Sequence, residues 1–144
     1  MTSAMQRSTA RVPSRLRVHR LPEPKVTERG VLYRRGGQRY LLAWTRVAQA
    51  FAAEVGDADG PGLTLFDLVL EGRGAECVVC RMDVPPGETA LRAARAILLA
   101  LGPDACDAGV RTLAEDGVAP RLPDAETFGQ RVLESIRFET GTLV

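Results

Sequence analysis

The sequence predicts a single small, soluble α+β domain, and three observations support this fold class. Runs of β-prone residues separated by glycine-containing turns fill most of the chain up to Val84. Over Glu88–Leu101 the apolar residues follow the 3.6-residue period of an amphipathic helix, which Gly102 and Pro103 end. With 144 residues, of which 45% are hydrophobic, the chain is long enough to form a core without metal or disulfides.

Two pairs of strands are expected in the first part of the chain. Lys25–Arg35 and Gln38–Trp44 flank a Gly-Gly pair, and glycine supplies the positive φ angles that a two-residue hairpin turn requires. Leu63–Leu70 and Glu76–Val84 flank a second glycine-containing loop. Because Leu63–Leu70 is apolar on both faces, it is expected to lie in the middle of a sheet.

Two other segments in this part of the chain are less regular. Arg15–Arg20 alternates weakly between apolar and polar residues, which predicts a first strand. Thr45–Val55 fits a strand or a helix, because Val47, Phe51 and Val55 share one face in either conformation. Its alanine content favours a helix, and periodicity alone leaves both alternatives open.

Helices are expected in the rest of the chain. The apolar stripe of the helix Glu88–Leu101 consists of Leu91, Ala94, Leu98 and Leu101, with Ile97 at its edge. A weaker helical segment covers Asp107–Glu115, and a final helix runs from an Asp124 N-cap to about Arg137. The residues expected in the core are Trp44, Phe51, Phe66, Leu68, Val79, Leu98 and Phe128.

The N-terminal residues are basic. Residues 1–25 hold five Arg, one Lys and a single acid, Glu23. Residues 1–14 lack periodicity and are expected to form a disordered basic leader, with Met5 as an alternative start and a transit peptide as the alternative interpretation. An odd number of cysteines without a secretory signal indicates a reducing compartment, so the expected location is cytoplasmic.

No catalytic, cofactor or metal site is predicted. His19, the one histidine, is expected to lie far from any serine, cysteine or aspartate cluster. Cys77 and Cys80 form a C-x-x-C motif inside a strand, which places their side chains on opposite faces about 10 Å apart, too far for a disulfide. A zinc site needs four ligands, and only Cys106 remains to complete one. Without a phosphate-binding glycine loop as well, the chain is not expected to be an enzyme.

One group of side chains is a candidate contact site. Basic and aromatic residues flank the Gly-Gly turn and are expected to gather at the hairpin tip; they are Tyr33, Arg34, Arg35, Arg39 and Tyr40. Such a cluster suits the phosphates of nucleic acid or of lipid headgroups. The alternative is a solvated hairpin end, in which arginine stems cover the tyrosine rings.

The stretch GVLYRRGGQRYLLAWTRV resembles bacterial pleckstrin-homology-like (PH-like) domains. The matching positions are Gly30, Leu32, Tyr33, Gly36 or Gly37, Leu42, Trp44 and Val47. The resemblance covers about residues 15–102 and implies a bent antiparallel sheet, or split barrel, packed by the amphipathic helix. It also implies that Thr45–Val55 is a strand and that the domain recognises protein or lipid. The alanines of 48–53 and the continuation over 103–144 depart from the family pattern.

The expected organisation is a leader (1–14), a PH-like α+β domain (15–102) and a helical extension packed on it (103–144). The preferred function is a non-enzymatic, cytoplasmic protein-interaction or adaptor module, in a signalling or envelope-associated assembly, whose partner is another protein. The alternative is a module that binds anionic lipid or nucleic acid through the hairpin tip and leader. An enzyme would require Cys77 or Cys80 to be an exposed thiolate of low pKa.

Overall fold

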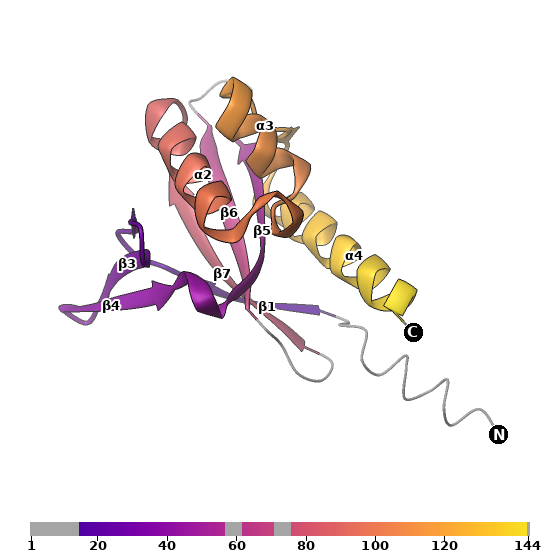
Figure 1. Cartoon of the computed structure of the whole chain (residues 1–144), viewed down its shortest axis with the longest axis horizontal. Coiled ribbons are helices and arrows are strands. Elements are labelled where there is room, and N and C mark those ends of the chain that lie inside the picture. The colour runs from indigo at the N-terminus through magenta and orange to yellow at the C-terminus, as the bar shows by residue number, and fades with distance from the viewer. Residues whose placement is uncertain (1–14, 57–61, 71–75, 144) are drawn as a thin grey trace.

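The computed structural model describes residues 15–56, 62–70 and 76–143 (Figure 1). It is a mixed α+β structure, and its larger sheet has the strand order β1-β7-β6-β5-β8. The strands of this sheet are β1 (Arg15–Arg20), β5 (Val47–Val55), β6 (Leu63–Leu70), β7 (Glu76–Val84) and β8 (Arg121–Leu122). The prediction that Leu63–Leu70 lies in the middle of a sheet is confirmed. The basic leader and Met5 lie outside the described residues.

The strands of the larger sheet do not all run antiparallel. β5, β6 and β7 form the expected antiparallel pairs, but β1 pairs with β7 and β8 pairs with β5 in parallel. The expectation of a bent antiparallel sheet therefore holds for the three central strands and not for the two outer ones. Long connections separate the partners of both outer pairs, and only such connections allow parallel pairing.

The smaller sheet has the order β2-β3-β4. Its strands are β2 (Lys25–Val26), β3 (Gly30–Arg35) and β4 (Gln38–Ala43). The predicted hairpin is confirmed, since β3 and β4 pair antiparallel around Gly36 and Gly37, whose φ angles are 61° and 80°. Val31 and Leu42 belong to the same core as α2 (Glu88–Leu101), so the strands curl partly around this helix while the hairpin tip extends away from it (Figure 1).

Helices cover both faces of the larger sheet. On one face, α2 and α3 (Ala108–Asp116) enclose a core that includes Phe66, Leu68 and Trp44. On the other face, α4 (Ala125–Leu143) encloses a second core. Its members are Phe51, Ala53, Val55, Leu65, Val69, Cys77, Val79, Leu122, Phe128, Val132 and Ile136. Among the described residues, no helix is long and apolar enough to span a membrane.

The ambiguous segment Thr45–Val55 is not a helix. A short 3₁₀ turn (Trp44–Arg46) leads into β5, which is buried on both faces. Ala50 and Ala52 are small enough to let α3 approach closely, to the point that a Cβ on Gly109 would collide with the carbonyl oxygen of Ala52. The alanines of this strand therefore serve helix-on-sheet packing.

Six of the seven expected core residues are buried, and Leu98 is the exception. Leu98 is only partly buried and packs at the margin of the core, whereas Ile97 is fully buried. Ile97 is buried more deeply than Leu98 because α2 packs against both the sheet and α3. This double contact centres its buried side on Ala90, Ala94 and Ile97.

Candidate functional site

The five candidate residues of the β3–β4 hairpin lie on its two faces. Side chains alternate along a strand, and directly paired residues share a face. Tyr33 pairs with Tyr40, while the neighbouring register positions pair Arg34 with Arg39. The expected single cluster is therefore divided into an aromatic face and an arginine face.

The aromatic face is held together by its own contacts. The Tyr33 and Tyr40 rings stack with their centroids 5.5 Å apart. The Arg35 guanidinium carbon lies 5.9 Å from the Tyr33 ring centroid, and Arg35 Nη2 donates a hydrogen bond to the Arg20 carbonyl oxygen at 2.9 Å. Arg35 therefore both covers a tyrosine ring and links the hairpin to β1.

The arginine face is open. Arg34 and Arg39 are exposed, and neither forms an ion pair with a carboxylate of the described residues. A hollow of about 180 Å³ lies beside them, lined by Glu23, Lys25, Leu32, Tyr33, Arg34 and Arg39. Three cations and one carboxylate, that of Glu23, thus border one small hollow, and their net positive charge suits a surface that contacts anionic groups.

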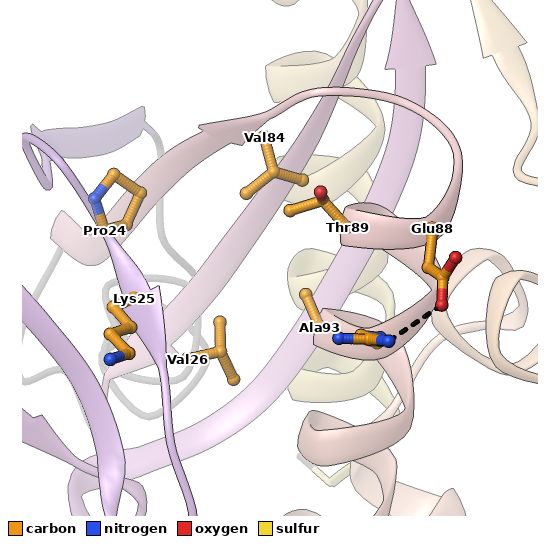
Figure 2. Close-up of a pocket in the computed structure, with 8 residues that line it drawn as sticks. Pro24, Lys25, Val26, Val84, Glu88, Thr89 and Ala93 are labelled. Carbon is orange, nitrogen blue, oxygen red and sulfur yellow. Dashed lines mark hydrogen bonds and ion pairs between the residues drawn. The ribbon is translucent and has the colours of Figure 1, made fainter.

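A larger hollow, of about 450 Å³, lies between β2 and the first turns of α2 (Figure 2). Its apolar lining includes Val26, Val84 and Ala93, and its lining residues also include Glu88 and Arg92. Glu88 and Arg92 pair with each other at 2.9 Å and are both exposed, so they neutralise one another at the surface of α2. Sequence reasoning missed this hollow, because its two walls come from residues far apart in the chain.

The three cysteines are free and buried. Cys77 belongs to the core under α4 and Cys80 to the core under α2, which confirms that the C-x-x-C side chains point to opposite faces. Burial raises the pKa of all three thiols, that of Cys106 to about 11. Within the described part of the chain, no group of three or more His, Cys, Asp or Glu residues is placed to hold a metal ion.

His19 has one cysteine as a neighbour. Strand β1 places it directly beside Cys80 in the parallel β1–β7 register, where the expectation was a position far from any serine, cysteine or aspartate cluster. This neighbour was missed because the register joins segments about sixty residues apart. Burial raises the pKa of the Cys80 thiol, which disfavours the nucleophilic thiolate. The pair is therefore a poor candidate for Cys-His chemistry.

One buried ion pair was also missed. Asp67 of β6 and Arg81 of β7 are opposite each other in the sheet and lie under α4, where the Arg81 guanidinium carbon is 5.5 Å from the Phe128 ring centroid. Asp67, the single charge inside the apolar run Leu63–Leu70, is the signal that could have revealed it. Its burial against a helix indicates a role in packing.

No protein-family model, curated protein or solved structure matches this chain. Of the surfaces above, the β3–β4 hairpin combines exposed apolar and aromatic side chains with exposed arginines.

Proposed function

We propose that the protein is a non-enzymatic protein-interaction or adaptor module that binds its partner through the β3–β4 hairpin. The observation that carries this proposal is the composition of the projecting hairpin. Tyr40 is 44% and Leu41 45% exposed, beside Arg34 and Arg39, which have no carboxylate partner among the described residues. Aromatic residues and arginine are enriched at protein interfaces, and an exposed apolar group beside them adds area to bury.

The resemblance to PH-like domains supports the same proposal. A curled sheet packed by α2 is compatible with a domain of that kind, although the parallel β1–β7 pair departs from an antiparallel barrel. Such domains tend to recognise protein or lipid rather than catalyse reactions. The three free, buried cysteines fit a reducing compartment, and we place the module in the cytoplasm, within a signalling or envelope-associated assembly.

A charge-matched pair of variants tests this function. The variant Arg34→Glu/Arg39→Glu alters the hairpin, and Arg121→Glu/Arg131→Glu makes the same change of charge at exposed positions of β8 and α4. Proteins captured from native lysate by the unaltered chain should be lost with the hairpin variant and retained with the control. If both variants capture the same proteins as the unaltered chain, the hairpin is not the binding surface.

A second candidate function is phosphate recognition, which the hollow bordered by Lys25, Arg34 and Arg39 favours. Binding to vesicles containing phosphatidylserine, or to single-stranded DNA, should then weaken steeply as salt rises, because phosphate contacts release counterions. The same Arg34→Glu/Arg39→Glu variant should abolish this binding. Binding that is insensitive to salt would count against a phosphate ligand.

A deletion of residues 1–14 alone tests whether the leader contributes to phosphate recognition. Strand β1 begins at Arg15, so a deletion that extended to residue 20 would remove an edge of the larger sheet as well. Loss of the basic residues of 1–14 should lower the affinity for anionic vesicles. Unchanged affinity would confine any phosphate contact to the hairpin.

A further inference from the structure

Strand β4 forms an open edge of the smaller sheet. The order β2-β3-β4 places it at the end, and β3 is its only strand neighbour among the described residues. The register between β3 and β4 runs from Gly30–Ala43 to Arg35–Gln38 without a shift, so no bulge interrupts this edge. Bulges and prolines are common protections of exposed edges, and β4 has neither.

The hydrogen bonds of β3 show which backbone groups face the open edge. The Arg34 N–H donates to the Pro22 carbonyl oxygen at 3.1 Å, on the side of β3 away from β4. Arg34 and Arg39 are therefore a non-hydrogen-bonded pair of the antiparallel ladder, and Leu32 and Leu41 are the next such pair. It follows that the backbone N–H and C=O groups of Arg39 and Leu41 point outward, away from β3.

The side chains beside this edge are exposed and carry one sign of charge. Arg39 and Leu41 lie on the arginine face, and Tyr40 lies on the aromatic face between them. No acidic residue occurs over residues 30–43, which contain Arg34, Arg35 and Arg39. The edge thus offers backbone hydrogen-bonding groups and an apolar side chain, beside arginines that have no carboxylate partner among the described residues.

We infer that the partner adds a β-strand to the β4 edge, and that the added segment is an extended, acidic peptide of another protein. This inference rests on the proposed protein-interaction function. Backbone hydrogen bonds to the edge give affinity, and alternate side chains give specificity. In an antiparallel arrangement, an acidic residue lies opposite Arg39 and an apolar residue lies opposite Leu41, two positions earlier in the peptide.

Charge argues against two other occupants of this edge. A second copy paired through the same edge would bring its own Arg39 to this edge, with Arg34 and Arg35 on the strand behind it, and like charges close together in a sheet are destabilising. Residues 1–14 contain Arg7 and Arg11 and no acid, so the leader is repelled in the same way. An acidic segment from a partner is the occupant that the charges favour.

Selection from a displayed library of random peptides by the full chain tests the inference. We expect enriched peptides in which an acidic residue follows an apolar residue by two positions. The enriched peptide is then synthesised with single N-methyl groups along its backbone. Methylation of every second residue, whose N–H faces β4, should weaken binding at least about tenfold. Methylation of the intervening residues, whose N–H groups point away from β4, should have little effect. Failure to enrich such peptides, or a methylation profile without this two-residue period, would overturn strand addition.

Two substitutions at one position provide the test from the side of the protein. Leu41→Pro removes an outward N–H without removing a bond to β3, and proline is tolerated on edge strands. Leu41→Ala also shortens the apolar side chain of residue 41 but keeps its backbone N–H. The proline variant should bind the peptide at least about tenfold more weakly than the alanine variant. Equal binding by two folded variants would contradict the inference, and if the proline variant unfolds, the methylation profile decides.

The outcomes separate this inference from the proposed function. Loss of the cellular partner with Arg34→Glu/Arg39→Glu, but not with Leu41→Pro, would retain a binding hairpin and reject strand addition. Retention of the partner by both variants would reject both proposals. A concentration-dependent dimer of the unaltered chain that Leu41→Pro abolishes, detected by sedimentation, would assign the edge to a second copy and overturn the acidic-peptide proposal.

Discussion

Arg81 donates two hydrogen bonds to the carboxylate of Asp67, from Nε to Oδ1 at 2.6 Å and from Nη2 to Oδ2 at 2.8 Å. The Asp67 side chain is fully buried and the Arg81 side chain is 10% exposed. Burial raises the pKa of Asp67, and Arg81 opposes that shift. The charge of each residue is therefore tolerated at this depth because the other is present.

Asp67→Asn should destabilise the protein by about 3–5 kcal/mol, because it leaves the Arg81 charge buried without a carboxylate. Urea unfolding, followed by the fluorescence of Trp44, the single tryptophan, measures the change. The matched control is Arg92→Gln, which breaks an exposed pair with Glu88 and should cost less than about 0.5 kcal/mol. Similar losses in both variants would show that the buried pair has no special importance for stability.

Two glycines inside helices should respond to alanine with opposite signs. At Gly109 the added Cβ collides with the Ala52 carbonyl oxygen, so α3 must move from β5 at a cost of about 1–3 kcal/mol. At Gly129 the nearest atoms are Arg81 Nη2 at 3.5 Å and Leu16 Cδ1 at 3.8 Å, which is ordinary contact. Gly129→Ala should therefore stabilise α4 by roughly 0.5–1 kcal/mol. Thermal unfolding of both variants measures the two effects, and a shared sign would contradict the close approach of α3.

The native cysteines should react slowly with iodoacetamide. At about pH 8, a thiol whose pKa is about 11, as for Cys106, is ionised roughly a hundredfold less than an ordinary thiol. Burial also raises the pKa of Cys77 and Cys80 and shields their sulfur atoms. Mass spectrometry should show alkylation at least about a hundredfold slower in the native protein than in urea. Fast alkylation of native Cys77 or Cys80 would instead support a reactive thiol and an enzyme.

Cys106 should also make the stability depend on alkaline pH. Because its pKa is raised in the folded protein, the unfolded chain loses the thiol proton first as the pH rises. This contribution to stability is fully present below about pH 8.5 and decreases as the pH approaches about 11. The free energy of unfolding should therefore fall less between these values in Cys106→Ala than in the unaltered chain. An equal fall in both proteins would show that Cys106 has the same pKa in the folded and the unfolded chain.

The N-cap of α3 should contribute more to the stability of the protein than the N-cap of α4. Asp107 Oδ1 accepts hydrogen bonds from the backbone N–H of Val110 at 2.9 Å and of Ala52 at 3.3 Å, so it joins the helix to β5. Asp107→Ala should cost about 1–2 kcal/mol. Asp124 caps α4 at an exposed position and accepts hydrogen bonds from the backbone and side chain of Thr127, within its own helix, so Asp124→Ala should cost less. Urea unfolding compares the two, and a larger loss at Asp124 would contradict the bridging role of Asp107.

Local signals in the sequence predicted several elements well. The Gly-Gly turn, the strand Leu63–Leu70 and the helix Glu88–Leu101 occur at the expected positions, because turn geometry and helical period depend on neighbouring residues. The conformation of Thr45–Val55 could not be predicted in this way. Pairing with β6 and helices on both faces make it a strand, and a register shift after Val47 moves that residue to the opposite core from Phe51.

The arrangement of the five hairpin residues was predicted only in part. They lie on β3 and β4 as expected, but they were treated as one cluster. The two-residue period of a strand separates Arg34 and Arg39 from Tyr33 and Tyr40, and this signal was present in the sequence. The neighbourhood of His19 and Cys80 was not predictable from local pattern, since it depends on a parallel register between distant strands.

The parallel pair of β1 and β7 has a consequence for biosynthesis. Strand β1 leaves the ribosome before its partner β7, which begins about sixty residues later in the chain. At about 5–20 residues per second, the nascent β1 waits several seconds for that partner. Among the described strands only β7 pairs with β1, so the edge of the nascent β1 has no partner strand during this interval. We expect this interval to be when the growing chain depends most on chaperones.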